Sequence, residues 1–310
     1  MQRILPRGEI ESLDHTAIPR SILPERASVF STRAARLRQL AQNNPISDYL
    51  LLMAHLAQAQ QGALAMFSAP GASNEQVARA QAHGMPPLQA IGWRRDPVWL
   101  DMLSALLDHM LSAADSPAQA AEICAKLQAR LGHDPSSLEA LADALLAERD
   151  DDVDGAAAPF VMAALQVYWT DLASRFDETQ LPVVSPFGVC PLCASLPVAS
   201  VVRVGGKSDG CRYLCCSLCA TQWHLVRVTC SHCEQTQGIA YHSIEGGAEA
   251  IRAESCDHCR TYRKIFYQEK DLYVEPVADD LASLPLDMLM GEEGYSRASG
   301  NPFLWQLVEG

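Results

Sequence analysis

The chain carries one cysteine pattern twice: CPLC at 190–193 and CSLC at 216–219, then CSHC at 230–233 and CDHC at 256–259. Within each copy 22 residues separate the two pairs, and each cysteine precedes its counterpart by 40 positions. A two-residue spacer lets two thiolates on one tight turn reach the same cation, and two such turns supply four sulfurs. The repeated spacing therefore predicts two tetrathiolate metal sites.

The equal spacing of the two copies favours separate sites. The first cluster would consist of Cys190, Cys193, Cys216 and Cys219, and the second cluster of Cys230, Cys233, Cys256 and Cys259. Only ten residues lie between Cys219 and Cys230, so other pairings stay open. Zinc and iron both accept four thiolates in a tetrahedron, and spacing alone does not name the metal. A metal that only holds the fold together is the alternative to a functional one.

Other side chains near the clusters are interpreted as residues that do not bind the metal. Cys211 and Cys215 lie outside the repeat, and Cys215 is expected to be a strand residue that points away from the metal. The alternative is a redox-active or substitute thiol. Four histidines lie nearby, but four sulfurs already complete each coordination shell; they are His224, His232, His242 and His258.

The residue after each second cysteine also bears on the metal. Rubredoxins usually have glycine there, which leaves room for backbone N–H groups to approach sulfur. This chain has Ala194, Ala220, Glu234 and Arg260 at those positions. The N–H···S geometry therefore stays open at this point.

The composition is that of a soluble globular protein, with 48% hydrophobic and 20% charged residues among 310. Ten of the 11 cysteines lie between Cys190 and Cys259, and only Cys124 lies elsewhere. That clustering indicates metal ligation rather than a secreted disulfide framework. The charged stretch at 1–15 lacks the apolar core of a signal peptide, and no segment approaches the roughly 20 apolar residues of a membrane span. We expect a cytoplasmic protein that does not insert into a membrane.

The charge of the cysteine-rich region argues against a nucleic-acid partner. Residues 190–270 contain nine Lys/Arg and seven Asp/Glu, a formal charge of +2 with neutral thiols. Each divalent metal bound by four thiolates contributes about −2, so the loaded region would carry about −2. A nucleic-acid-binding ribbon normally presents a basic surface.

The first part of the chain is predicted to be helical throughout. Three starts combine a capping residue with a following proline, at Asp96-Pro97, Ser116-Pro117 and Asp134-Pro135. Further helices are expected over 27–42, over 48–66 after a Ser47 cap, and over 157–176. This half shows no nucleophile–base pair, phosphate loop or metal motif. We therefore expect a scaffold or partner-binding platform rather than an enzyme.

The predicted fold class is α+β in two parts. A helical domain at 20–178 and a linker at 179–189 precede two tandem rubredoxin-like or zinc-ribbon β modules at 190–228 and 229–272, followed by a C-terminal tail with a short helix at 273–310. Strands are expected over 197–204, 212–214, 222–228, 239–243 and 262–268. A module of about 40 residues buries little core, so its metal would supply most of its stability.

Longer strings around the cysteines carry a family resemblance. They are CPLC at 190–193, RYLCCSLC at 212–219, WHLVRVTCSHCEQT at 223–236, AESCDHC at 253–259, YQEKD at 267–271, VEPVADDLASLPLD at 274–287 and NPF at 301–303. A looser likeness extends over 27–41 and 48–61. On these strings the chain resembles the FdhE family of formate dehydrogenase accessory proteins.

The resemblance implies a role in cytoplasmic maturation of respiratory formate dehydrogenases, with contact to the catalytic subunit before export. It also implies rubredoxin-like iron at the eight cysteines, so two iron ions are expected, with zinc as the alternative. One residue departs from the pattern: Cys215 is a thiol where a residue such as histidine is expected. Competition from Cys215 would disturb ligation at the first cluster.

Three functions follow from these observations. The first is an assembly factor that docks an immature formate dehydrogenase catalytic subunit. The second is a rubredoxin-like electron-transfer or redox protein, because iron bound by four thiolates cycles between two oxidation states whereas zinc does not. The third, a zinc-ribbon nucleic-acid binder, is disfavoured by the charge of the region.

Overall fold

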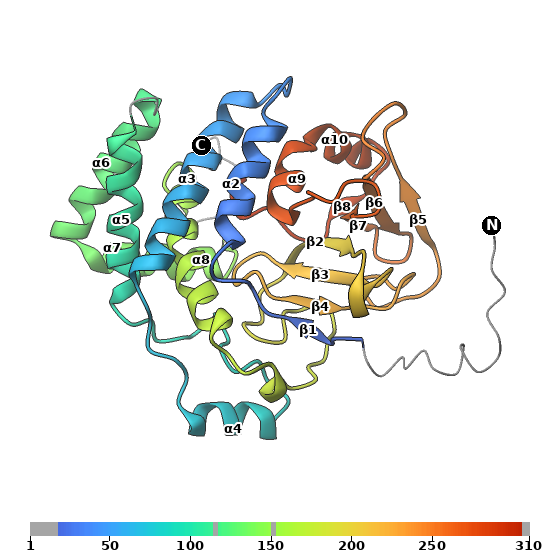
Figure 1. Ribbon diagram of the computed structural model, residues 1–310, viewed down its shortest axis with the longest axis horizontal. Coiled ribbons are helices and arrows are strands. Elements are labelled where there is room, and N and C mark those ends of the chain that lie inside the picture. Colours follow the sequence, from blue (N-terminus) through green and yellow to red (C-terminus); the bar gives the residue numbers. More distant parts are fainter. Residues whose placement is uncertain (1–17, 114–116, 150–152, 306–310) are drawn as a thin grey trace.

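The computed structural model in Figure 1 describes residues 18–113, 117–149 and 153–305. Helices form the N-terminal half, and a mixed sheet covered by further helices forms the C-terminal half, so the predicted α+β architecture is confirmed. The segment considered for a signal peptide and the expected cap Ser116 lie outside the described ranges. Within those ranges, no helix is both long and apolar enough to cross a membrane.

The helical half is built around α8, which lies between the outer helices and the sheet (Figure 1). Every residue of α8 from Ala158 to Ala173 is buried, as expected of a predominantly apolar helix, and the buried polar residues include Gln166 and Asp171. It packs against α3, α5 and α7. The helices of this half are α2 (Val29–Leu40), α3 (Ser47–Met66), α4 (Asn74–Ala82), α5 (Val98–Ser112), α6 (Ala118–His133), α7 (Pro135–Leu146) and α8 (Ala158–Ser174).

The capping signals are only partly realised. Asp134 accepts a hydrogen bond from the Ser137 amide, 3.2 Å away, and caps α7 as predicted. Ser47 is instead the first residue of α3 and makes no capping hydrogen bond. Helix α4 was not predicted, although Ser73 and Gln76 form a capping box at its start.

The two β modules share one sheet, with the strand order β1-β4-β3-β2-β7-β6-β5, and β8 pairs with β7. Each module is antiparallel, and the parallel pairing of β2 with β7 joins the two modules. The modules are therefore not separate ribbons, because they form a common sheet, and the share of their stability that a metal would supply stays a prediction. The strands are β1 (Ser21–Ile22), β2 (Pro197–Val202), β3 (Arg212–Cys216), β4 (Gln222–His224), β5 (Ile239–His242), β6 (Ile251–Cys256), β7 (Thr261–Tyr267) and β8 (Ser296–Arg297).

The hydrophobic core runs from the helical half into the first module and includes all four cysteines of the first cluster. A separate small core under the second module consists of Ala253, Tyr262, Leu286 and Met290. The cysteines of the second cluster belong to neither core. The two modules thus share a sheet but lie in different surroundings.

The C-terminal tail forms two helices, α9 (Pro276–Ala282) and α10 (Leu284–Glu292), where one short helix was expected. Proline in the first turn suits a helix start, and Pro285 cannot continue the hydrogen-bond ladder of α9, so a new helix begins there. Helix α9 packs against α2 and against β2 and β7. The buried pair Arg36–Asp279, with N···O 2.6 Å, ties α2 to α9.

Candidate metal centres

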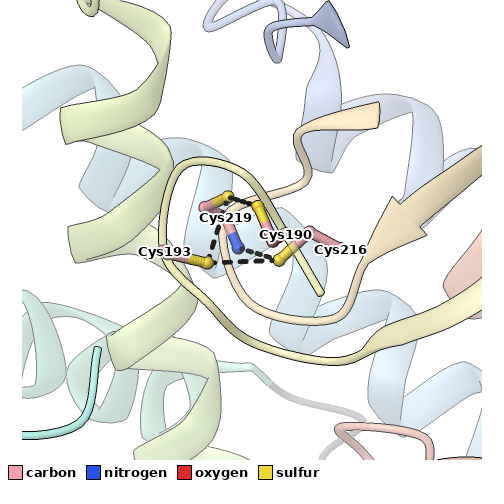
Figure 2. A group of neighbouring side chains, drawn as sticks. All are labelled: Cys190, Cys193, Cys216 and Cys219. Atoms are coloured by element: carbon pink, nitrogen blue, oxygen red, sulfur yellow. Dashed lines mark hydrogen bonds between the residues drawn. The ribbon is translucent and has the colours of Figure 1, made fainter. Parts of the chain in front are cut away.

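The first cluster brings its four sulfurs together in a buried site between two loops (Figure 2). Cys190 and Cys193 precede β2, whereas Cys216 ends β3 and Cys219 lies in the turn before β4. The Sγ atoms are 3.6 Å apart for Cys190–Cys219, 3.4 Å for Cys193–Cys216 and 3.5 Å for Cys193–Cys219. A tetrahedron with metal–sulfur bonds of about 2.3 Å has edges of about 3.8 Å. The sulfurs are therefore close to the spacing that one metal ion requires.

The second cluster repeats this arrangement before β5 and in the turn between β6 and β7. The Sγ atoms are 3.7 Å apart both for Cys230–Cys259 and for Cys233–Cys256. All four ligand atoms lie within 4.8 Å of one another. The structure thus groups the eight cysteines by copy.

The turn after each second cysteine adopts a left-handed backbone without glycine. The φ angles are 65° at Ala194, 58° at Ala220, 61° at Glu234 and 56° at Arg260. This conformation costs a residue with a side chain roughly 1–2 kcal/mol. Four equivalent residues share it, so the cysteine turns tolerate that cost without glycine.

Backbone amides approach sulfur despite the missing glycines. In the first cluster the amides of Leu218 and Cys219 both lie 3.4 Å from the Cys216 Sγ. In the second cluster the amides of His232 and Cys233 lie 3.4 and 3.5 Å from the Cys230 Sγ. N–H groups directed at sulfur stabilise a thiolate, so these contacts favour the ligating form of Cys216 and Cys230 and oppose the effect of burial on their pKa values.

A threonine two residues after the last cysteine of each copy contacts the cluster. The Thr221 hydroxyl lies 3.2 Å from the Cys219 Sγ, and the Thr261 hydroxyl lies 3.1 Å from the Cys259 Sγ. With a thiolate at that position, the hydroxyl donates to sulfur and orients it. Neither threonine was predicted as a site residue, although Cys-x-Thr recurs at the same 40-residue interval.

Burial and hydrogen bonding shift the cysteine pKa values in opposite directions. Burial raises the pKa of Cys190 and of Cys216. Burial also raises the pKa of Cys233 to about 12. Burial alone would raise the pKa of Cys259 as well, but hydrogen bonds from the hydroxyl and backbone of Thr261 lower it to about 7. Since only thiolates ligate, metal binding must displace protons, and metal affinity falls as pH falls.

The residues that were not expected to bind metal lie outside both clusters. Cys215 is buried on β3, where burial raises the pKa of its thiol, and its neighbour Cys216 faces the first cluster. Cys211 lies 3.6 Å from the Asp209 carbonyl oxygen. Among the described residues, no histidine joins either group of four sulfurs. Cys215 therefore does not compete for the first cluster.

The segment before the first cluster lies against the second. The Phe187 amide donates to Glu234 Oε1 at 2.7 Å, and the Trp223 indole donates to the Phe187 carbonyl at 2.8 Å. A Cβ atom placed on Gly188 would lie only 2.3 Å from the Ser231 carbonyl oxygen, within the Cys230–Cys233 turn. Only glycine therefore allows this close approach.

Substituting Gly188→Ala is expected to lower the free energy of unfolding by about 1–3 kcal/mol, the usual cost of overpacking. The added methyl group would push against backbone rather than against a side chain that can rotate away. Chemical denaturation of the parent protein and the variant measures the change. Gly62→Ala is the matched control, because that glycine lies within α3 with no atom near its Cβ position. The control should leave the free energy of unfolding unchanged or raise it. An equal change in both variants would contradict the close approach of Gly188 to the Ser231 backbone.

Comparisons with known proteins agree along most of the chain. Three family models match in succession: FdhE, N-terminal at 18–185, FdhE, central domain at 189–227, and FdhE, C-terminal domain at 228–304. The Protein FdhE homolog of Cronobacter sakazakii is 42% identical over 308 residues, covering 98% of this chain and 97% of that protein. Protein FdhE of Escherichia coli K12 is 41% identical over 307 residues, with the same coverage. The crystal structure of the FdhE protein from Pseudomonas aeruginosa superposes with a TM-score of 0.82 at 38% identity, covering 92% of this chain and 99% of that chain.

Proposed function

The chain belongs to the FdhE family, and we propose that it is an accessory protein for the maturation of formate dehydrogenase. In this proposal it binds the catalytic subunit of that enzyme in the cytoplasm and carries two metal ions, each held by four cysteines. It acts as an assembly factor and catalyses no reaction of its own. The observation that supports the metal sites is the grouping of the eight cysteines into two sets of four facing sulfurs.

The cysteine clusters fit a soft, tetrahedral metal ion. Each offers sulfur donors alone, with Sγ–Sγ distances near those of a tetrahedron around one ion. We infer that the ligands are Cys190, Cys193, Cys216 and Cys219 for one ion and Cys230, Cys233, Cys256 and Cys259 for the other. Iron is the metal that we propose, with zinc as the alternative.

Affinity capture tests the proposed partner. The tagged protein, expressed at native level in its own host under anaerobic growth, is expected to co-elute with a formate dehydrogenase catalytic subunit. A folded, metal-loaded protein that recovers no such subunit would contradict the proposal. The control is Cys124→Ser, a change at a buried thiol of α6 that lies outside both clusters and should keep the interaction.

A redox role is the second candidate, and the half-exposed second cluster favours it. Cys233 and Cys259 are both partly open to solvent, which would bring iron within reach of an electron-transfer partner. Four-thiolate iron would supply a one-electron couple, whereas zinc would not. Colourless protein with stoichiometric zinc from the native host would contradict this candidate.

A further inference from the structure

The two clusters have the same cysteine geometry but different exposure. In the first cluster Cys190, Cys193 and Cys219 are fully buried and Cys216 is 3% exposed. In the second cluster only Cys230 and Cys256 are buried, at 5% and 2% exposed, while Cys233 and Cys259 are half-buried. The open pair contains the second cysteine of each turn. Two ligand residues of the second cluster are therefore partly open to solvent, whereas all four of the first cluster are buried.

The cysteine turns of the first cluster are bound to the helical half. The Leu88 amide donates to the Leu192 carbonyl at 2.8 Å, and the Ala90 amide donates to the Cys193 carbonyl at 2.9 Å. The other turn accepts a hydrogen bond from the Gln166 side chain of α8 at the Ser217 carbonyl, 2.7 Å away. Opening this cluster would therefore require separating the sheet from the helices.

The residue before the second cysteine of each turn also differs in exposure between the two clusters. In the first cluster it is leucine, and both Leu192 and Leu218 are buried in the main core. At the equivalent positions of the second cluster the chain has His232 and His258, both exposed. Opening the first cluster would expose these two buried leucines to water, which is unfavourable. The second cluster has no such apolar anchor at these positions.

The second cluster is held from its inner side. Arg263 on β7 is buried and donates to the Ser231 hydroxyl at 2.8 Å, which fixes the Cys230–Cys233 turn against the sheet. β5, which follows this turn, is the edge strand of the sheet. The inner sulfurs are thus anchored, whereas Cys233 and Cys259 are partly exposed and belong to neither hydrophobic core.

We propose that the two clusters have different tasks: the second cluster exchanges its metal with external thiols or chelators, and the first retains its metal as a structural element. This inference rests on the metal binding proposed above. In the exchange step an external thiol would coordinate the metal through its sulfur and displace the thiolate of Cys233 or Cys259. The proton of the external thiol would pass to the displaced thiolate. One metal–sulfur bond forms as another breaks, and the metal keeps its oxidation state.

Chelator competition on the intact protein tests the proposal. The protein is loaded with two equivalents of zinc, challenged with 4-(2-pyridylazo)resorcinol, and pulsed with N-ethylmaleimide at intervals before peptide mass spectrometry. One equivalent should leave at least about tenfold faster than the other, a difference of about 1.4 kcal/mol in activation free energy. Cys233 and Cys259 should be alkylated with that fast equivalent.

Two matched variants show which cluster releases the fast equivalent of zinc and which releases the slow one. Cys259→Ser should remove the fast equivalent and leave the slow one, whereas Cys219→Ser, at the equivalent position, should remove the slow one. Since Cys219→Ser can unfold the chain, the alkylation order in the unsubstituted protein decides independently. Release of both equivalents in one phase, or early alkylation of the first cluster, would overturn the inference. Elemental analysis before the challenge separates this failure from failure of metal binding itself, which would show as fewer than two equivalents.

Discussion

Replacing Cys190 by serine is expected to empty the first cluster and to destabilise the whole fold, not only one ribbon. Cys190 is fully buried in the core that joins the helices to the sheet. A structural zinc ion contributes about 10–16 kcal/mol to folding in zinc-finger peptides at pH 7, so loss of one ligand removes a large part of that term. Metal content by elemental analysis and the thermal unfolding midpoint both measure the effect.

Cys124→Ser is the control for this substitution. Cys124 is equally buried, but it lies in α6, away from both clusters. Burial raises the pKa of its thiol to about 11, as expected of a neutral core side chain. Its replacement should cost some stability, since a hydroxyl is buried, and should leave metal content unchanged. Equal loss of metal from both variants would show that the cluster assignment is wrong.

The substitution Glu254→Gln is expected to lower the free energy of unfolding by about 3–5 kcal/mol, because it leaves a buried guanidinium without its counterion. The Arg212 side chain on β3 is fully buried, and its Nη2 lies 2.8 Å from Glu254 Oε1 on β6. The Ser200 hydroxyl and the Thr229 carbonyl accept its other hydrogen bonds but carry no charge. This ion pair links the first β module to the second.

Denaturant titration of both proteins with their metal bound measures the change. Glu122→Gln is the matched control, because Glu122 pairs with Lys126 at 2.7 Å on the exposed face of α6. Exposed ion pairs contribute little to stability, so that variant should unfold like the parent. A Glu254→Gln protein as stable as the control would mean that the pair does not hold the modules together.

Local signals predicted the parts of the structure that depend on neighbouring residues. The cysteine spacing predicted which sulfurs group together, and the Asp134-Pro135 pair predicted the start of α7. Strand β6 was missed, because its sequence IRAESC has a charged residue in a buried position. Glu254 can be buried there because Arg212, 42 positions earlier, reaches it from β3 and the Tyr241 hydroxyl donates to it from β5.

Long-range contacts decide what the cysteine motifs could not show. The parallel pairing of Ser200 with Ile265 joins the modules into one sheet, and no local sequence pattern predicts this pairing. The different burial of the two clusters depends on which module the helical half covers. One local signal for the different burial was present in the sequence: the first copy has Leu218 where the second copy has His258.

Elemental analysis combined with X-ray absorption spectroscopy tests the central claim most directly. The protein purified anaerobically from its native host should contain two metal ions per chain, each surrounded by sulfur alone at about 2.3 Å. Fewer than two metal ions in folded protein, or a first shell that contains nitrogen or oxygen, would contradict the assignment of the eight cysteines to two four-sulfur centres.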